Sequence, residues 1–430
     1  MVTQSQLLVP TLGPCTIPSP LANRHASKRR FMADDTRVLF EVEYRAGAPI
    51  DERSLEKSGP REKIFFEPAK TKAAIVTCGG LCPGINNVIR NLYYTLKANY
   101  GVQSVIGIRN GYEGLNPAQG EAPCELTDSM VEHIHHRGGT VLGTSRGPQD
   151  PVVTVNFLES MGVDILFTIG GDGTQRGAHA IAAEVTRRGA KIAVVGIPKT
   201  IDNDIKFCYQ TFGFLTAVAE AEKVIDRAHI EATSMENGVG LVKLMGREAG
   251  FIAAAATIAS GEVNFTLIPE APFELAGPRG FLPKLAHRLR ERKHAVVVVA
   301  EGAGQEHLAD GQEEYDASGN RKLDDIGPFL KGKIEAYCRE VSLPVGVKYF
   351  DPSYFIRSAH ADAADSLLTE QLSRHAVHAA MAGKTDMFVG LWHNHTVHVP
   401  LALNTGEKKR LETDRDMWAA VLAITGQEDW

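Results

Sequence analysis

Short runs of apolar residues recur along the chain and alternate with segments whose apolar residues follow a helical spacing. The runs 73–77, 164–169 and 192–197 are each followed at once by glycine, proline or polar residues. Segment 214–229 instead places its apolar residues three or four positions apart, which is the spacing of one helix face. Short apolar strands alternating with helices predict an α/β protein with a mostly parallel sheet.

Later and earlier parts of the chain add to this organisation. The apolar runs 240–245 and 295–300 predict a second α/β unit, and the polar, turn-rich segment 306–325 favours an exposed loop. The first thirty or so residues are rich in Pro, Ser and Thr and end in the basic run 28–30, so we expect a mobile tail there, with a transit peptide as the alternative. A small extra element is expected around 38–44.

Composition narrows the possible functions. Of the 430 residues, 43% are hydrophobic and 23% are charged, which is typical of a soluble globular protein with two domains. The net charge of -6 argues against a general nucleic-acid binder, because phosphate backbones require a concentrated basic surface. No apolar run approaches the ~18 residues that span a bilayer, so no membrane role is expected. The six scattered cysteines, including Cys78 and Cys82, form no zinc or disulfide pattern, which favours a cytoplasmic location.

A glycine-rich turn follows the first apolar run. Residues 77–87 read Thr-Cys-Gly-Gly-Leu-Cys-Pro-Gly-Ile-Asn-Asn and lead into a helix that we expect to begin near Asn86. Glycines let the backbone approach an oxyanion, and N–H groups at a helix start attract negative charge. The turn matches neither the dinucleotide fingerprint nor a Walker A loop. It indicates a phosphate-binding loop, with a purely steric glycine turn as the alternative.

A second turn places a carboxylate inside a glycine cluster. The run 164–169 continues as Gly-Gly-Asp-Gly-Thr, in which Asp172 is a natural magnesium ligand, because Mg²⁺ favours one or two carboxylates with phosphate oxygens and water. A helix-capping aspartate is the alternative. Arg146, in a Gly-Thr-Ser-Arg-Gly-Pro loop, could reach the same phosphates or could simply be solvated.

The third turn carries a compact group of reactive side chains. Residues 197–204 read Ile-Pro-Lys-Thr-Ile-Asp-Asn-Asp. Attack of a hydroxyl on a phosphate needs a base, and either Asp202 or Asp204 can accept that proton while the other orients the base or the metal waters. An Asx-type turn explains the local pattern, but not its place at a strand end beside the glycine turns.

Six motifs in this order resemble the phosphofructokinase family, most closely the long form of plants and trypanosomatids, and the similarity runs from about 72 to 403. They are Gly-Gly-Leu-Cys-Pro-Gly, Gly-Gly-Asp-Gly-Thr, Pro-Lys-Thr-Ile-Asp-Asn-Asp, Lys-Leu-Met-Gly-Arg, Ala-Glu-Gly and Asp-Pro-Ser-Tyr-Phe-Ile-Arg. The resemblance implies two Rossmann-like three-layer α/β domains of the phosphofructokinase fold with an N-terminal extension. The expected boundaries are 1–70 for a partly disordered extension, 71–235 for an ATP and Mg²⁺ domain with chain crossing between the domains, 236–405 for a fructose 6-phosphate domain, and 406–430 for a C-terminal segment.

The resemblance also implies an ATP-dependent 6-phosphofructokinase of glycolysis that uses Mg²⁺. Asp202 would then be the base, assisted by Thr200 and Asp204, while Asp172 would hold Mg²⁺ and Arg247 would stabilise the transferring phosphoryl group. The implied ATP-binding residues are Gly79, Tyr112, Arg146, Gly147, Gly171, Asp172, Gly173, Thr174 and Gly177. The implied fructose 6-phosphate residues are Thr200, Ile201, Asp202, Met245, Gly246, Arg247, Glu301, Lys348, Tyr354 and Arg357.

The family uses either ATP or diphosphate, and two positions favour different donors. Lys199 is typical of diphosphate users, whereas Gly173 is typical of ATP users, since an aspartate there would occupy and repel the α-phosphate. An aspartate at position 173 would exclude ATP outright, whereas a lysine at position 199 attracts any phosphate and excludes neither donor. We therefore give more weight to Gly173 and predict ATP, with a diphosphate-dependent enzyme as the alternative. Two departures from the short bacterial form, Gly238 for an arginine and Tyr354 for a histidine, leave cross-subunit recognition of the 6-phosphate open, and Lys243 could compensate.

Two other classes of function fit the sequence less well. A nicotinamide-dependent oxidoreductase would need a fingerprint turn followed by an acidic residue, which the glycine turns lack. A non-catalytic regulatory subunit would be expected to have lost a base or metal ligand, yet Asp172, Asp202 and Arg247 are all present. The family is usually homo-oligomeric, so a dimer or tetramer is expected.

Overall fold

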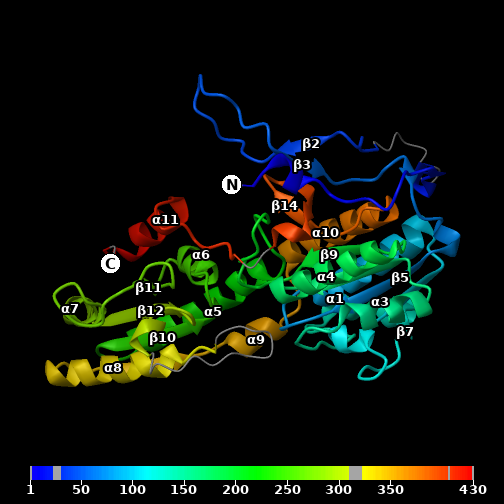
Figure 1. The fold of residues 1–430 in the computed structure, drawn as a ribbon. Coiled ribbons are helices and arrows are strands. Elements are labelled where there is room, and N and C mark those ends of the chain that lie inside the picture. Colours follow the sequence, from blue (N-terminus) through cyan, green and yellow to red (C-terminus); the bar gives the residue numbers. More distant parts are fainter. Residues whose placement is uncertain (1, 23–30, 309–321, 405–406, 429–430) are drawn as a thin grey trace. The chain divides into compact units, whose positions relative to one another are not determined.

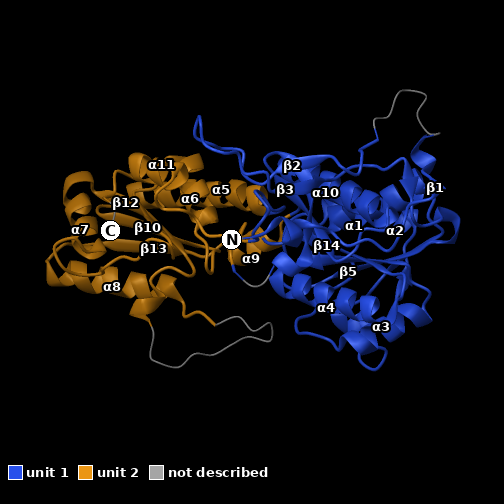
Figure 2. Cartoon of the chain, turned by 45° about the horizontal axis from the view of Figure 1, so that its top comes forward, with its two compact units in different colours: residues 1–200, 205–213, 360–407 blue, residues 201–204, 214–359, 408–430 orange. Residues whose placement is uncertain are grey.

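The computed structural model describes residues 2–22, 31–308, 322–404 and 407–428. The chain divides into two compact units: unit 1 comprises residues 1–200, 205–213 and 360–407, and unit 2 comprises residues 201–204, 214–359 and 408–430 (Figure 2). The basic run 28–30 and most of the predicted loop at 306–325 lie outside the described residues.

A nine-stranded sheet forms the centre of unit 1, in the order β2-β3-β15-β14-β9-β8-β5-β6-β7 (Figure 1). Its central strands β14, β9, β8, β5 and β6 run parallel, and β15, β3, β2 and β7 are added through antiparallel pairs. The strands of unit 1 are β1 Ile17–Pro18, β2 Arg37–Leu39, β3 Ser54–Lys57, β4 Lys63–Ile64, β5 Lys72–Thr77, β6 Ser104–Gly107, β7 Cys124–Glu125, β8 Ile165–Gly170, β9 Ala193–Pro198, β14 Met387–Trp392 and β15 His395–Pro400.

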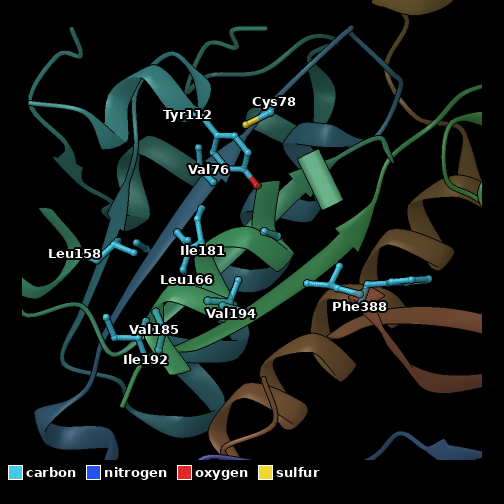
Figure 3. Close-up of a cluster of buried hydrophobic side chains, with 14 of the residues drawn as sticks. Val76, Cys78, Tyr112, Leu158, Leu166, Ile181, Val185, Ile192, Val194 and Phe388 are labelled. Atoms are coloured by element: carbon cyan, nitrogen blue, oxygen red, sulfur yellow. The ribbon is translucent and has the colours of Figure 1, made fainter. Parts of the chain in front are cut away.

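Helices cover both faces of this sheet. Figure 2 shows α1 and α10 on one face and α3 and α4 on the other. These helices, with the short α2, are α1 Ile85–Tyr94, α2 Asp128–Val131, α3 Pro151–Ser160, α4 Asp172–Arg188 and α10 Ala363–Met381. Figure 3 shows part of the core between the sheet and α4, where Val76, Leu166 and Val194 pack with Ile181 and Val185. Parallel strands buried on both faces require continuous apolar sequence, which is why the runs ending in β5, β8 and β9 could be predicted.

Unit 2 is built on a smaller sheet of four parallel strands in the order β11-β12-β10-β13. Its strands are β10 Gly238–Leu244, β11 Phe265–Leu267, β12 His294–Ala300 and β13 Gly346–Phe350. Its helices are α5 Phe214–Thr233, α6 Phe251–Ser260, α7 Phe281–Arg292, α8 Ile326–Glu340, α9 Ser353–Ser358 and α11 Asp416–Thr425. The predicted α/β class and the predicted second unit are therefore confirmed.

Alternate residues of β10 face different helices. Leu241 belongs to a core cluster with Leu285 of α7 and Leu330 of α8. On the opposite face, a Cβ at Gly240 would lie 2.6 Å from a carbonyl oxygen of α5, and one at Gly238 would lie 2.2 Å from another. The close approach of α5 therefore requires glycine at both positions, and it explains why Gly238 carries no phosphate-binding side chain.

The unit boundaries differ from the predicted domains. The predicted fructose 6-phosphate domain, 236–405, runs across a return of the chain to unit 1 at residue 360, where α10, β14 and β15 complete the first sheet. The C-terminal segment from residue 408 then joins unit 2. Such crossings depend on strand pairing between distant segments, which local sequence patterns do not reveal.

The described part of the N-terminal extension packs on unit 1 rather than forming the expected tail. Leu7 and Leu21 are fully buried or nearly so, and the Cys15 thiol donates a hydrogen bond to the carbonyl oxygen of Ala382 at 3.2 Å. Of the element expected around 38–44, the structure contains only the three-residue strand β2. The extension contributes β2 and β3 to the edge of the large sheet.

A buried group of charges joins the extension to the sheet. The Glu56 carboxylate of β3 lies 2.8 Å from Arg61 Nη2, 2.9 Å from Lys384 Nζ and 3.2 Å from His398 Nδ1 of β15. Although burial alone would raise the pKa of Glu56, the hydrogen bond from His398 and the neighbouring Lys384 ammonium hold it well below its usual range. Glu56 therefore stays a carboxylate and compensates the cations buried around it.

Removal of this carboxylate should strongly destabilise the protein. We expect Glu56→Ala to lower the free energy of unfolding by about 3–5 kcal/mol, because uncompensated cations would remain buried. Urea denaturation of the variant and of wild type measures the difference. Glu67→Ala is the control, since Glu67 forms an exposed pair with Lys70 and its loss should change stability little. Equal effects of the two substitutions would contradict a compensating role for Glu56.

Candidate active site

Three adjacent parallel strands bring the predicted phosphate loops to one edge of the large sheet. Thr77 of β5 lies beside Ile169 of β8, and Gly170 of β8 lies beside Pro198 of β9. The loops that follow therefore start side by side, as in other open α/β sheets whose ligands bind beyond the carboxyl ends of the strands. The backbone N–H of Lys199 also donates to the carbonyl oxygen of Gly170 at 3.0 Å, which links the second and third loops.

The first glycine loop is hydrogen-bonded to the loop that carries Arg146. Gly79 has a φ of +82°, which favours glycine, and its N–H donates to the carbonyl oxygen of Ser145 at 3.0 Å. The Thr144 hydroxyl donates to the carbonyl oxygen of Gly79 at 2.7 Å. Residues 144–147, which include Arg146 and Gly147, are thereby fixed beside the first loop.

Two cations lie next to the first glycine loop. The Lys199 ammonium is buried and donates to the carbonyl oxygen of Gly80 at 2.6 Å. Nη2 of Arg146 lies 3.8 Å from the point where a Cβ of Gly80 would be. The structure therefore brings Lys199 and Arg146 to the same loop, where they can attract phosphate oxygens.

The second glycine loop begins α4 and exposes backbone rather than side chains. Gly171 precedes the helix in an extended conformation, and Asp172, its first residue, is largely buried. A Cβ at Gly173 would have Arg176 Nη2, at 3.8 Å, as its nearest neighbour, whereas one at Gly170 would lie 2.1 Å from Thr174 Oγ1. Gly173 therefore borders open space, while Gly170 is required by close packing.

Tyr112 and Gly177 support this loop from within the core. The buried Tyr112 hydroxyl donates to the carbonyl oxygen of Thr174 at 2.7 Å, and a Cβ at Gly177 would lie 2.6 Å from the Tyr112 ring. Figure 3 shows the ring beside Cys78, whose thiol has its pKa raised to about 12 by burial. The Tyr112 ring therefore leaves no room for a side chain at position 177. Contact of either residue with a nucleotide stays a prediction.

The Asp172 position suits a magnesium ion that takes one ligand from the protein and most of its other ligands from phosphate oxygens and water. Among the described residues, no group of three or more His, Cys, Asp or Glu side chains is arranged to hold a metal. Mg²⁺ commonly takes only one or two protein carboxylates and completes its shell with phosphate oxygens and water. A carboxylate between the side-chain-free positions Gly171 and Gly173 fits that requirement.

In unit 2, the loops after β10 and β12 interlock. The N–H of Gly302 donates to the carbonyl oxygen of Gly246 at 3.0 Å, and the N–H of Glu301 donates to that of Leu244 at 2.9 Å. A Cβ at Gly302 would lie only 1.8 Å from the carbonyl oxygen of Arg247, so this contact requires glycine. The Lys-Leu-Met-Gly-Arg and Ala-Glu-Gly motifs are therefore two halves of one structure that positions Arg247 and Glu301.

Residues 197–204, the turn after β9, are called the catalytic segment below because they include the proposed base, and this segment places Asp202 in unit 2 with Arg247 and Glu301. The chain passes from unit 1 to unit 2 between Thr200 and Ile201. Burial raises the pKa of the Asp202 carboxyl to about 8, with further contributions from Asp204 and Glu301, while Lys408 and Arg247 oppose the shift. A buried carboxyl with a raised pKa is typical of a general base, because a pKa close to the working pH makes the carboxylate more basic while a usable fraction of it stays deprotonated.

Lys408 was not predicted from the sequence. Its Nζ lies 2.5 Å from Oδ2 of Asp204, although the two residues are 204 positions apart. The only signal in the sequence is the basic run Lys408-Lys409-Arg410, which resembles any solvated surface segment.

The remaining predicted sugar-phosphate residues occupy varied positions in unit 2. Met245 is buried, Lys348 is exposed on β13, and Tyr354 of α9 is 78% exposed with the Arg357 guanidinium 5.1 Å from its ring centre. Arg357 also lowers the pKa of Glu301, against the larger effect of burial, which raises it.

Lys243, considered as a compensating cation, has two carboxylate partners. Its ammonium lies 2.9 Å from both Asp325 and Asp351. Although burial lowers its pKa, the hydrogen bonds to these carboxylates raise the pKa of Lys243 overall. Two carboxylates already neutralise this cation, so the geometry gives no support for a phosphate-binding role.

The predicted residues thus fall into two groups. Unit 1 holds Gly79, Tyr112, Arg146, Gly147, Gly171, Asp172, Gly173, Thr174, Gly177, Lys199 and Thr200. Unit 2 holds Ile201, Asp202, Asp204, Met245, Gly246, Arg247, Glu301, Lys348, Tyr354 and Arg357. The predicted division into nucleotide and sugar residues follows this boundary except at Thr200.

Comparisons with known proteins identify the family of this chain. Residues 72–380 match the family model described as phosphofructokinase. The chain is 46% identical to the ATP-dependent 6-phosphofructokinase of Borreliella burgdorferi over 97% of this chain and 96% of that protein. It is also 46% identical to ATP-dependent 6-phosphofructokinase 5, chloroplastic, of Arabidopsis thaliana, over 88% of this chain and 70% of that protein.

Structural similarity extends beyond these relatives. A crystal structure described as a pyrophosphate-dependent phosphofructokinase from Marinobacter aquaeolei superposes with a TM-score of 0.68, at 21% identity, over 84% of this chain and 92% of that chain. At this identity the likeness concerns the fold alone. Across the described residues, no helix combines the length and the apolar character needed to cross a membrane. The six motifs, the fold and the 46% identity over 97% of this chain agree with one another, so the chain belongs to the phosphofructokinase family.

Proposed function

We propose that this enzyme is an ATP-dependent 6-phosphofructokinase, which transfers the γ-phosphoryl group of ATP to the 1-hydroxyl of fructose 6-phosphate. The observation that carries the proposal is the 46% identity to the Borreliella burgdorferi ATP-dependent enzyme over 97% of this chain. The reaction forms a bond between the sugar oxygen and the γ-phosphorus and breaks the bond between that phosphorus and the bridging oxygen of ADP. The hydroxyl proton passes to a base.

Residues of unit 1 bind ATP in this proposal. Backbone N–H groups of the two glycine loops and the cations Arg146 and Lys199 attract phosphate oxygens. Asp172 would hold Mg²⁺, which neutralises charge on the phosphates when bound. Gly173 supports ATP over diphosphate, because the space beside it can accept an α-phosphate without a repelling side chain.

Residues of unit 2 bind the sugar phosphate and accept the proton. Asp202 is the proposed base, because it is a buried carboxyl with a raised pKa beside Arg247. The Arg247 guanidinium stabilises charge on the transferring phosphoryl group. Glu301, Tyr354 and Arg357 are proposed to bind the sugar hydroxyls and phosphate, and Lys348 the 6-phosphate.

A donor comparison tests this proposal. Purified enzyme is assayed for fructose 1,6-bisphosphate formation with ATP or diphosphate, each with Mg²⁺ or with excess chelator. We expect turnover with ATP and Mg²⁺, little turnover with diphosphate, and none with chelator. Equal or greater turnover with diphosphate would instead favour the diphosphate-dependent alternative, to which Lys199 points.

The proposal extends to assembly and location. We expect a homodimer or homotetramer, which light scattering on the purified protein measures directly. A cytoplasmic location is also proposed, although the Arabidopsis thaliana relative is named as chloroplastic. Microscopy of the tagged full chain in its own cells distinguishes the two locations.

A further inference from the structure

The C-terminal segment of the chain contacts the catalytic segment within unit 2. Nζ of Lys408 lies 2.5 Å from Oδ2 of Asp204, and the backbone N–H of Lys409 donates to the carbonyl oxygen of Asp204 at 2.8 Å. The side chains of Lys408 and Asp204 are only 21% and 7% exposed. Removing such a pair from water costs much of what their attraction contributes, so stability alone is a weak reason for placing it here.

A second contact fixes the position from which Lys408 reaches Asp204. The partly buried Glu270 carboxylate accepts a hydrogen bond from the N–H of Leu411 at 2.8 Å and from the N–H of Gly250, just before α6, at 3.0 Å. The segment around residues 408–411 is therefore tied both to the catalytic segment and to the start of α6. The backbone next to Lys408 is held in place by the hydrogen bonds of Lys409 and Leu411.

The charges around Asp202 show what this lysine can do. Burial raises the pKa of Asp202 most, and Asp204 and Glu301 raise it further, while Lys408 and Arg247 lower it. Asp202 can accept a proton only as a carboxylate, and a second carboxylate two residues away opposes that state. A cation held on Asp204 offsets this repulsion.

We propose that Lys408 is a positioning residue of the active site, whose ion pair with Asp204 keeps Asp202 available as the carboxylate that accepts the sugar proton. This inference rests on the proposed function, because it assigns Lys408 a part in that reaction. It adds the C-terminal segment, through one cation, to the groups that set the acid–base behaviour of the catalytic segment.

The test is the pH dependence of a charge-removing variant. For Lys408→Met, we expect the acidic limb of kcat/KM for fructose 6-phosphate to move up by about one pH unit, because loss of a nearby cation favours the neutral acid. At pH 7, kcat/KM should fall about tenfold, and above the limb it should return close to the wild-type value. Lys408→Arg keeps the charge and should retain the wild-type limb.

Controls separate this effect from general damage. Lys223→Met removes a lysine from an exposed pair with Glu220 on α5, so its pH profile should match wild type. Thermal melting and circular dichroism of each variant establish that it is folded, and the milder Lys408→Gln serves if Lys408→Met does not fold.

The outcomes distinguish the two proposals. Wild-type enzyme without turnover on ATP and fructose 6-phosphate would overturn the proposed function and this inference with it. Active wild type with an unmoved limb in Lys408→Met or Lys408→Gln, or with an equal loss at every pH, would overturn the inference alone. An upward shift in the neutral variant that Lys408→Arg restores would support it.

Discussion

Replacing Asp202 with asparagine should lower kcat by about 10³-fold, because a general base contributes ~10²–10⁴ to such a step. Asparagine has nearly the same shape but cannot take the hydroxyl proton. KM for fructose 6-phosphate should change little, since the substitution removes a function needed in the transition state rather than in binding. Steady-state kinetics with saturating ATP and Mg²⁺ measures both constants.

Stability distinguishes loss of chemistry from loss of fold in this variant. Burial and two neighbouring carboxylates raise the pKa of Asp202, so its charged form is costly in the folded protein and asparagine should not lower the melting temperature. Asp226→Asn, an exposed position on α5, is the matched control and should keep full activity. If Asp202→Asn retained more than about a tenth of wild-type kcat, Asp202 would not be the base.

Placing aspartate at position 173 should suppress the use of ATP. The space around Gly173 admits a side chain, since the nearest atom to a Cβ there is 3.8 Å away, so Gly173→Asp should fold normally. Its carboxylate would oppose the α-phosphate, and like charges placed together cost several kcal/mol, so kcat/KM for ATP should fall about 10²–10³-fold. Rates with ATP and with diphosphate, measured on the same preparation, give the change in preference.

An asparagine at the same position separates charge from size. Gly173→Asn fills the same volume without a negative charge, so its loss of ATP use should be smaller if repulsion dominates and equal if bulk dominates. Diphosphate lacks the α-phosphate and should be affected least by either substitution. Unchanged ATP kinetics in Gly173→Asp would contradict the role assigned to this glycine and remove the main residue-level support for ATP.

Local patterns predicted the strand ends well because each motif is continuous in sequence. The turn after β8 carries Asp172 and Gly173 within a few residues, and the turn after β9 carries Asp202 in the same way. Parallel strands that are buried on both faces can be recognised in the sequence as apolar runs. The side chains that follow each run therefore lie at the carboxyl end of that strand. Lys408 escaped prediction because its partner Asp204 is 204 residues distant.

The structure also shows packing contacts for residues that we had considered only as ligand contacts. Tyr112 and Gly177 are predicted to contact the nucleotide, and the structure in addition packs them against each other beneath the Thr174 loop. Gly238 looked like a lost phosphate ligand, and the close approach of α5 explains it instead. Such distinctions depend on which atoms lie nearby in space, and no spacing rule contains that information.

The sequence by itself determined the α/β class, the phosphofructokinase family and the segments proposed to carry phosphate, metal and base chemistry, because these depend on apolar runs and on contiguous motifs. The tertiary structure decided where the units divide, since α10, β14 and β15 return to the first sheet through pairing with distant strands. It also decided which charges meet in buried surroundings, as at Glu56 and at the Lys408–Asp204 pair. The physical reason is that the interaction of two charges depends on their separation and on their burial, and only the folded chain brings residues distant in sequence within a few ångströms of one another.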